Sequence, residues 1–503
     1  MSRTRLFLLF SCLTALAACT PAPEWGPVAV PRQSPQGWSA AYAVTTDSVG
    51  DVYLAGQFDD TITFGQTRLV SAGLTDAFVA KWSPRRQRWC WAVRAGGDSH
   101  ESALAVAVSR AGVFVAGNFS SYAADFGADT LANTVVEFPG TSHWHSDLFV
   151  ARLAVDTVGA RIAWARQAGG AGDESVRALA VRGADVYLAG TFASAALALG
   201  DTILCNARDS LSDGNEYDPL THGFMAKWHD EGSWPRPCWA RRLGGRFGGY
   251  ATALAVQDSG VYVAGNFQGP GDDLGSAYLP NAGQTDMYVL KLHDTGRRSV
   301  IEWMRSAGGR DTEYATALVV QPGRVYVAGM FNSPAAEFGS HRLVNADTAD
   351  LRTPYVTTLD YDGFIAALDD AGPATRFVWV QALGGSRTEA VTGLAVQGRQ
   401  VYVAGHFRGP RLPLGRYVLR NPAQLATEEI FLARFTDYGP RSACTGLLQA
   451  GGPHDESTYA LARHAGRLYL TGIARDSARF GEVRLRTDST FGSSYLAEVI
   501  TGK

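Results

Sequence analysis

The chain has 503 residues, of which 46% are hydrophobic and 18% charged, a balance typical of a packed globular protein and not of a disordered one. Its formal net charge of −3 provides no overall basic field of the kind that nucleic acids attract, so we expect no nucleic-acid partner. No internal stretch is long and apolar enough to cross a bilayer.

The first twenty residues, MSRTRLFLLFSCLTALAACT, have the order of an export signal: two arginines, then an apolar run, then small residues. The run ends in LAAC (16–19), which resembles the lipobox of bacterial lipoproteins. The resemblance implies that 1–18 are a signal peptide, that Cys19 is lipidated, and that 19–23 link the anchor to the fold. An ordinary secretory signal with a chance cysteine is the alternative.

A heptad of the form VYVAGNF (261–267) occurs seven times. The other copies are VYLAGQF (52–58), VFVAGNF (113–119), VYLAGTF (186–192), VYVAGMF (325–331), VYVAGHF (401–407) and LYLTGIA (468–474). The six steps from Gly56 to Gly472 average about 69 residues, which indicates a repeat architecture.

Each repeat before the seventh contains four short segments that are rich in β-branched and aromatic residues and bounded by Gly, Pro, Asp and Asn, which is typical of strands and turns. In one repeat they are ALAV (253–256), the heptad (261–267), DMYVLKL (286–292) and WMRSAGG (303–309). Both sides of the heptad are apolar, so we expect both of its faces to be buried between neighbouring sheets. Turn residues such as QDSG (257–260) predict a hairpin of the first two strands.

Small four-stranded sheets arranged around an axis form a β-propeller, and the sequence therefore predicts an all-β, seven-bladed β-propeller as a single domain over 24–503. The seventh repeat ends at Lys503 without a fourth strand, whereas EWGPVAV (24–30) precedes the first repeat. We expect 24–30 to pair with 494–500 and close the ring, because an unpaired sheet edge is a liability. A linker after the anchor is the alternative interpretation of 24–30.

The succession of D-x-F-V-A-K, W-A-x-x-A-G-G and A-V…G-x-V-Y-V-x-G resembles the SBBP-type β-propeller repeat proteins of bacteria, over about residues 38–503. The resemblance implies an exported or surface-associated propeller, and it supplies no catalytic residues. We therefore expect a lipid-anchored protein of the bacterial cell envelope, at the outer membrane in preference to the inner, on its periplasmic or exposed side. Its expected partner is an envelope protein or a glycan.

Enzyme signatures are absent: there is no G-x-S-x-G elbow, no H-E-x-x-H and no P-loop. His143 and His145 could suit a metal, but no third ligand is evident and we expect a solvated loop. We expect no cofactor and no metal, and a binding or scaffolding module that presents one loop-rich face. The alternative is an envelope enzyme, carbohydrate-active or quinone-dependent, with its site at the central channel, and a third possibility is a spacer.

Tryptophan recurs at one position of the fourth strand, as Trp91, Trp164, Trp239, Trp303 and Trp379. A residue repeated in every unit is a packing residue before it is a site. Beyond the signal region and Cys19, the cysteines are Cys90, Cys205, Cys238 and Cys444. Cys205 and Cys238 fall within one repeat, so they are the pair we expect if a disulfide forms.

Functional sites are expected where the repeats differ. The long connections between second and third strands are 120–146, 193–222, 332–361 and 408–428. By analogy with other propellers, they lie on the binding face. The turns between third and fourth strands carry many arginines, namely Arg85, Arg86, Arg88, Arg236, Arg297, Arg298, Arg376 and Arg441. Solubility explains these arginines, and contact with anionic lipid head groups is the alternative.

The passages from a fourth strand to the next first strand carry carboxylates. They are Asp98 and Glu101, Asp173 and Glu174, Asp311 and Glu313, Glu389, and Asp455 and Glu456. Because the first strand is innermost in a propeller, these residues predict an acidic channel mouth that attracts cations or basic ligands. The alternative is that they are ordinary turn residues, partly offset by Arg246, Arg310 and Arg387.

Overall fold

The structure is a computed structural model that describes residues 22–134, 145–156, 159–206, 220–244, 247–269, 279–347, 360–421 and 427–502. These residues form antiparallel sheets joined by turns, together with the 3-10 turn η2 (Gly372–Ala374), so the protein is all-β. Within those ranges, no helix has the length and apolar character needed to cross a membrane.

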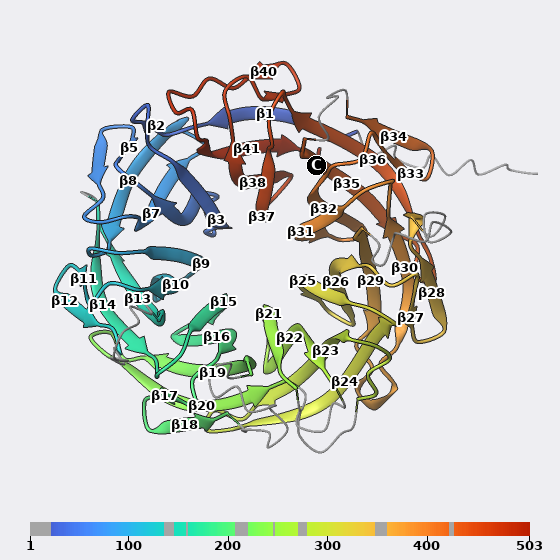
Figure 1. Cartoon of the computed structure of the whole chain (residues 1–503), viewed down its shortest axis with the longest axis horizontal. Helices are drawn as coiled ribbons and strands as arrows, with labels where there is room; N and C mark the ends of the chain where they lie inside the picture. The colour runs from blue at the N-terminus through green and yellow to red at the C-terminus, as the bar shows by residue number, and fades with distance from the viewer. Residues whose placement is uncertain are drawn as a thin grey trace, which may run out of the picture.

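Among the described residues, seven antiparallel units of four strands stand around a central axis, each with its first strand innermost (Figure 1), and two of these units belong to six-stranded sheets that also include an outer hairpin. From the innermost strand outward, the units are as follows: sheet 1, β3 (Ser39–Thr46), β4 (Val52–Phe58), β7 (Asp76–Ser83) and β8 (Arg88–Ala95); sheet 2, β9 (Glu101–Ser109), β10 (Gly112–Phe119), β13 (Asp147–Val155) and β14 (Ala160–Ala168); sheet 3, β15 (Glu174–Arg182), β16 (Asp185–Phe192), β19 (His222–Asp230) and β20 (Pro235–Leu243); sheet 4, β21 (Gly249–Gln257), β22 (Gly260–Gln268), β23 (Thr285–Asp294) and β24 (Ser299–Gly309); sheet 5, β25 (Glu313–Gln321), β26 (Arg324–Phe331), β29 (Asp362–Asp369) and β30 (Phe377–Leu383); sheet 6, β31 (Glu389–Gln397), β32 (Gln400–Phe407), β35 (Glu429–Asp437) and β36 (Ser442–Gly451); sheet 7, β37 (Ser457–His464), β38 (Arg467–Ala474), β41 (Ser493–Ile500) and β1 (Glu24–Ala29).

Short outer hairpins, which the sequence analysis did not predict, occupy the long connections between second and third strands. They are β5 (Thr61–Phe64) with β6 (Thr67–Val70) and the flanking β2 (Arg32–Gln33); β11 (Ala123–Phe126) with β12 (Asp129–Ala132); β17 (Ala196–Leu199) with β18 (Thr202–Cys205); β27 (Ala335–Phe338) with β28 (His341–Val344); β33 (Arg411–Leu414) with β34 (Tyr417–Arg420); and β39 (Arg479–Phe480) with β40 (Val483–Arg484). Each turns at a glycine with positive φ, such as Gly127 at +76° and Gly339 at +63°.

The heptad glycine is required by the strand pairing beside it. Each innermost strand has a β-bulge opposite this glycine, as between Ala251 and Ala253 in sheet 4. A Cβ added to Gly265 would lie far inside van der Waals contact with the carbonyl oxygen of Tyr250, and the equivalent glycine of every other sheet meets the equivalent carbonyl. The backbone φ is not positive here, so close approach, and not conformational freedom, selects glycine.

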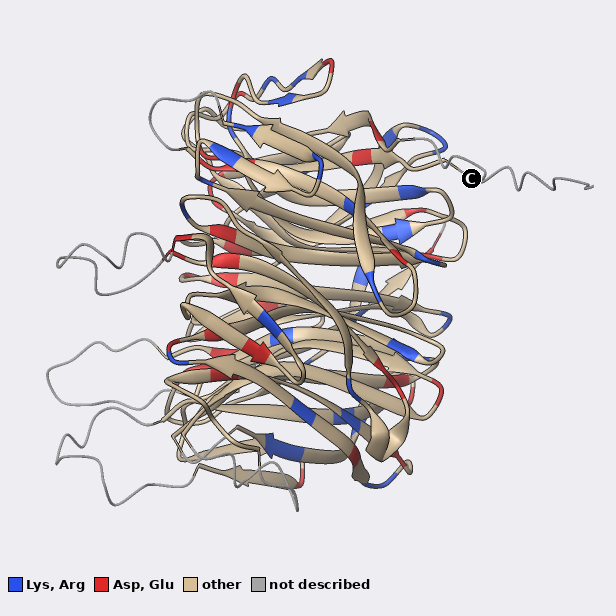
Figure 2. Cartoon of the chain, turned by 90° about the vertical axis from the view of Figure 1, so that its right-hand side faces the viewer, with Lys and Arg blue, Asp and Glu red and all other residues tan. Residues whose placement is uncertain are grey.

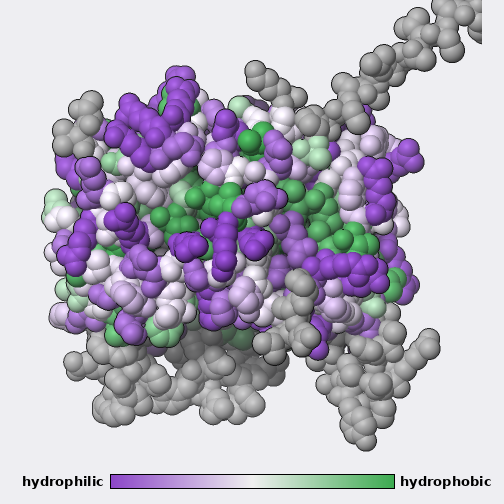
Figure 3. All heavy atoms as spheres, turned by 90° about the horizontal axis from the view of Figure 1, so that it is seen from above, coloured by the Kyte–Doolittle hydropathy of each residue, from purple (hydrophilic) through white to green (hydrophobic). Residues whose placement is uncertain are grey.

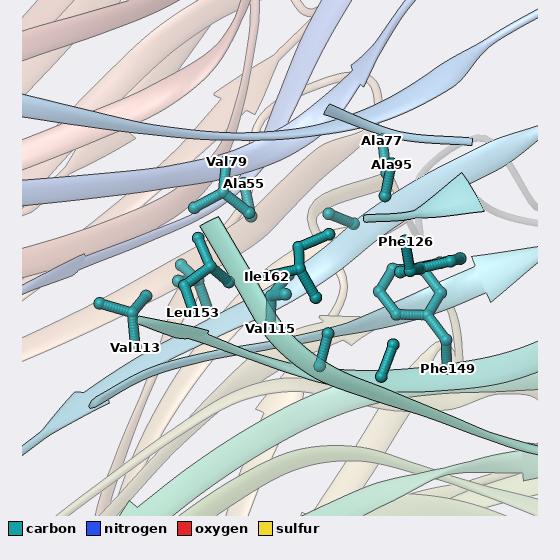
Figure 4. Close-up of a cluster of buried hydrophobic side chains, with 14 of the residues drawn as sticks. Ala55, Ala77, Val79, Ala95, Val113, Val115, Phe126, Phe149, Leu153 and Ile162 are labelled. Carbon is teal, nitrogen blue, oxygen red and sulfur yellow. The ribbon is translucent and has the colours of Figure 1, made fainter. Parts of the chain in front are cut away.

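The core is divided into clusters, each formed by the facing sides of two successive sheets. Between sheets 1 and 2, Val79 packs in one cluster with Val115 and Ile162, and the Phe126 and Phe149 rings lie tilted against each other at a centroid distance of 4.8 Å (Figure 4). Equivalent clusters join sheets 2 to 7 in order. A further cluster joins sheet 7 to sheet 1, with Tyr469 and Leu496 packed among residues of sheet 1. Burial on both faces explains the apolar character of both sides of the heptad.

The N-terminal strand pairs as the sequence analysis predicted. β1 lies antiparallel to β41, with Glu24 opposite Ile500 and Ala29 opposite Leu496. Trp25 donates a hydrogen bond from Nε1 to the carbonyl oxygen of Gln449 at 2.9 Å, which ties β1 to sheet 6 as well. β1 thus takes the outermost place in sheet 7, where the repeat itself supplies no fourth strand.

The outer wall carries patches of hydrophobic surface that gather across the middle of the wall between hydrophilic residues, as an edge-on view shows (Figure 3). Part of it comes from the second strands of the outer hairpins, where Val70, Ile203 and Val344 are exposed. A pocket of about 590 Å³ lies on this wall between sheets 5 and 6, beside Ala382, Phe435 and Cys444.

Candidate functional site: the carboxylate face

Carboxyl groups meet in pairs at the junctions between successive sheets. In each pair, one carboxyl belongs to the first or second residue of a third strand, and the other to the first residue of the next sheet's innermost strand or the residue just before it. The pairs are Asp76 with Glu101, Asp147 with Glu174, Asp286 with Glu313, Asp362 with Glu389, and Glu429 with Glu456. All ten residues are buried. We call the face of the ring at which these strands begin the carboxylate face.

The Gly-Gly motif that ends each fourth strand makes room for these carboxyls. A Cβ on Gly384 would collide with the carboxyl group of Asp362, and the equivalent first glycines meet the equivalent carboxyls. The amide of Gly385 donates to Oε2 of Glu389 at 2.7 Å, as the amide of Gly309 does for Glu313. The motif is therefore a cradle for the carboxyl pair.

Burial raises the pKa of most of these carboxyls, and the neighbouring carboxylate adds to the shift. The pKa of Glu389 rises to about 9 through burial first and then through Asp362. Burial likewise raises the pKa of Glu456 to about 8, with Glu429 as the next contribution. Burial raises the pKa of Asp362 to about 7. Oδ1 of Asp362 and Oε1 of Glu389 have no hydrogen-bond partner, which fits a pair that holds a proton.

Two junctions depart from this pattern. Between sheets 3 and 4, His222 and Gly249 stand at the two carboxyl positions. Between sheets 7 and 1, Ser493 and Ser39 stand at the two carboxyl positions. Ser39 donates a hydrogen bond from Oγ to Oγ of the adjacent Ser494 at 3.1 Å. Serines thus replace the carboxyl pair at this junction.

The prediction that glutamates line an open channel mouth is wrong. Glu101, Glu174, Glu313, Glu389 and Glu456 are each 0% exposed. The first four side chains turn back between two sheets and accept a hydrogen bond from a Gly-Gly amide. They are structural groups that no ligand can reach without opening a junction.

The aspartates of the same passages do reach the surface. Asp98, Asp173 and Asp455 are exposed, and Asp311 is half-buried with an ion pair to Arg310 at 3.3 Å. Oδ1 of Asp173 accepts from the amide of Ser146 at 2.9 Å, and Oδ1 of Asp455 from the amide of Glu428 at the same distance. These bonds fix the two carboxylates while leaving their other oxygens to solvent.

Carboxylates lie at both faces of the molecule but gather more densely at one of them. Figure 2 shows this denser group on the left of that view, with others on the right. The opposite face, which we call the turn face, carries the hairpin turns between first and second strands and between third and fourth strands, such as 84–87, 295–298 and 438–441. Figure 2 places the C-terminus toward the turn face.

The recurrent tryptophan joins sheets near the turn face, beyond the packing role that the sequence indicated. Nε1 of Trp239 donates to Oδ1 of Asp294 in the next sheet at 3.1 Å, and Tyr187 and Lys227 donate to Oδ2 at 2.6 and 2.7 Å. Burial alone would raise the pKa of Asp294, but the bonds from Lys227 and Tyr187 outweigh it and lower the pKa well below its ordinary value. Trp303 meets Asp370 in the same way, at 2.9 Å.

Among the residues that the structure describes, no group of three or more His, Cys, Asp or Glu is placed to hold a metal ion. The expected pairing of Cys205 with Cys238 is wrong, because Cys205 lies exposed on an outer hairpin and both thiols are free. Cys19 and His143 lie outside the described residues.

No family model and no curated protein matches the chain. Among solved structures, the chain is similar to a protein of unknown function from Dyadobacter fermentans DSM 18053, with 9% sequence identity, a TM-score of 0.40 and coverage of 96% of this chain and 100% of that chain. It is also similar to a Trypanosoma rangeli sialidase in complex with the inhibitor DANA, with 9% identity, a TM-score of 0.26 and coverage of 94% and 92%. At these TM-scores neither structure informs the site.

Proposed function

We propose that the seven sheets are the blades of a seven-bladed β-propeller of the SBBP type, closed by the N-terminal strand. Each innermost strand contacts the innermost strands of both neighbouring sheets, and β37 contacts β3 in the same way. The hydrophobic cluster between sheets 7 and 1 supports the same arrangement. A closed ring leaves no apolar sheet face open between its first and last blades.

We propose further that the protein is exported and anchored in a bacterial envelope, with the outer membrane preferred, through an acylated Cys19. The export signal and the LAAC sequence (16–19) support this proposal. The first strand starts at Glu24, so the propeller would follow the anchor with almost no linker. Membrane fractions should retain the wild-type protein and lose the Cys19→Ser variant.

Within this setting we propose a binding module whose carboxylate face receives a cationic partner, such as a basic segment of an envelope protein. The observation that carries the proposal is the gathering of exposed aspartates on the face from which the long connections between second and third strands depart (Figure 2). The negative charge of the carboxylate face would raise its association rate with a cationic partner and would disfavour binding of anionic partners. The buried carboxyl pairs are closed to a substrate, so they do not favour the enzymatic alternative.

The test is calorimetric titration with a short oligolysine peptide and, separately, with Ca²⁺. A variant with Asp98→Asn, Asp173→Asn, Asp360→Asn and Asp455→Asn should bind the peptide at least about tenfold more weakly than the wild-type protein, because each change removes an exposed negative charge at constant shape.

A matched control removes four exposed carboxylates elsewhere, through Asp201→Asn, Asp258→Asn, Glu337→Gln and Glu482→Gln. The control should bind the peptide like the wild-type protein. Equal loss in both variants would mean that net charge alone drives binding, and absence of binding by the wild-type protein would overturn the proposal.

A further inference from the structure

The turn face carries an excess of exposed positive charge. Its hairpin turns include the exposed residues Arg85, Arg86, Arg110, Arg297, Arg298 and Arg441, which come from four different sheets. The exposed carboxylates in the same turns are Asp156, Glu231 and Asp258, and Glu231 is paired with Arg236 at 2.9 Å. The exposed charges of the described turns are therefore mainly basic, with the named arginines contributed by four of the seven sheets.

Aromatic side chains stand among these arginines at the tips of two turns. Trp234 is 56% exposed in the turn before β20, and Tyr438 is 44% exposed in the turn before β36. The guanidinium of Arg166 lies 3.3 Å from the centroid of Trp234, and those of Arg399 and Arg441 lie within 6 Å of Tyr438. Exposed Trp and Tyr beside cations are typical of surfaces that meet the head-group region of a membrane.

The chain enters the fold at this same face. Glu24 pairs with Ile500, and Ile500 also pairs with Arg467, the first residue after the turn between β37 and β38. The N-terminal end of β1 therefore lies at the turn face, on the side of the ring away from the carboxylate face.

We propose that the turn face docks on an anionic membrane surface, with the arginines facing lipid phosphates and Trp234 and Tyr438 reaching the interfacial region. The inference deepens the proposed function, since an anchor at Cys19 would hold this face against the bilayer and direct the carboxylate face away from it. The docking itself depends only on the described residues, so it can be tested without the anchor.

A membrane fits this face better than a soluble polyanion does. The arginines are spread over turns from different sheets around a broad, flat ring, which matches an extended planar surface of negative charge. A polysaccharide or nucleic acid strand would instead favour a continuous basic groove. Juxtamembrane arginines gain affinity from anionic lipid without any fixed pairing geometry.

The experiment uses a chain that starts at Thr20, which retains every strand because the first begins at Glu24. Its binding is measured by co-sedimentation with vesicles of equal parts phosphatidylglycerol and phosphatidylcholine, and with vesicles of phosphatidylcholine alone. The anionic vesicles should bind the protein, and the neutral vesicles should not. A variant with Arg85→Gln, Arg297→Gln and Arg298→Gln should bind the anionic vesicles at least about tenfold more weakly.

The matched control has Arg310→Gln, Arg387→Gln and Arg408→Gln, three exposed arginines at the carboxylate face. This control should bind anionic vesicles like the wild-type protein, and circular dichroism verifies that both variants are folded. Equal loss in the two variants, or no preference of the wild-type protein for anionic vesicles, would overturn the inference. So would complete competition by soluble polyphosphate at matched charge, which would assign the face to a polyanion. None of these results bears on acylation of Cys19, which membrane fractionation tests separately.

Discussion

At the scale of single residues, the main chemical feature of this protein is its set of buried carboxyl pairs. At the junction of sheets 5 and 6, Glu389 and Asp362 lie against a Gly-Gly cradle with an unpartnered oxygen each. The interaction of Glu389 with Asp347 and Asp360 raises its pKa further, after burial and Asp362. Water does not solvate the ionised form of these buried carboxyl groups, so the pair is more stable when it carries a proton than when both groups are ionised.

These pairs predict that the protein loses stability as the pH rises. The unfolded chain binds the same protons only below about pH 4.5. The folded pKa of Glu389 is about 9 and that of Asp362 about 7. Their contribution to stability is therefore complete below about pH 4 and is lost as the pH rises through 7 toward 9. The free energy of unfolding in urea should be lower at pH 8 than at pH 5.

The Glu389→Gln variant separates this effect from other titrations. The amide keeps an acceptor for Gly385 and cannot ionise, so the variant should be more stable than the wild-type protein at pH 8, by about 2 kcal/mol, with a flatter pH profile. Glu337→Gln, on an exposed outer hairpin, should leave the profile unchanged. A Glu389→Gln profile as steep as that of the wild-type protein would contradict the account.

The positions of the glutamates could be predicted from the sequence, but the direction in which their side chains point could not. Glu389 and the residues equivalent to it each stand four residues after the second glycine of a Gly-Gly, a position typical of an exposed passage between strands. The partner of Glu389, Asp362, becomes apparent only in the structure, because it lies far from Glu389 in the sequence and is buried by the packing of two sheets. The repetition of Asp at the start of the third strand was a signal that could have indicated a pair.

At the scale of the strand, the heptad glycine and the bulge opposite it fix how the two inner strands pair. The glycine lets the carbonyl of the second residue of the innermost strand approach its backbone, as Tyr250 does at Gly265. The repeat period, the strand order and the hairpin of the first two strands were all predictable from the sequence, since they depend on local alternation and turn residues. The bulge was not, because it depends on the partner strand.

Substitution of one heptad glycine tests this pairing. Gly265→Ala places a methyl group against the Tyr250 carbonyl and the Tyr288 ring, so it should lower the free energy of unfolding by about 3 kcal/mol through overpacking. Gly159→Ala is the control, because nothing lies within 4 Å of its added Cβ. That control should change stability by less than about 0.5 kcal/mol. Similar stabilities for the two variants, measured by urea denaturation, would contradict the role of the bulge.

The outer hairpins show where strand prediction failed and why. Segments such as ADFGADTLA (124–132) and AEFGSHRLV (336–344) repeat an aromatic-glycine turn between alternating apolar residues. Their strands are four residues long and pair mainly with each other. The alternation of apolar and polar residues therefore extends over too few positions to be recognised as a strand in the sequence. The glycines with positive φ, such as Gly127, were the available signal.

At the scale of the whole molecule, the two ends of the chain decide the architecture. The seventh repeat has three strands of its own, and β1 supplies the outermost one across more than four hundred residues of sequence. The same pairing places the N-terminal end of β1 at the turn face and so separates the proposed membrane side from the proposed binding side. Closure of the ring is therefore the central claim on which both functional proposals depend.

Disulfide trapping between β1 and β41 tests this claim most directly. With Cys90, Cys205, Cys238 and Cys444 replaced by Ser, the pair Val28→Cys and Ala497→Cys stands at directly opposed positions. Its Cα atoms should fall within the roughly 4.4–6.8 Å that a disulfide requires. The control pair, Val28→Cys and Val499→Cys, is displaced by two residues on the same side of the strand. Mass spectrometry under mild oxidation should find the first pair nearly fully bonded and the control pair largely reduced. Equal yields for the two pairs, or reduced thiols in both, would contradict a ring closed by the N-terminal strand.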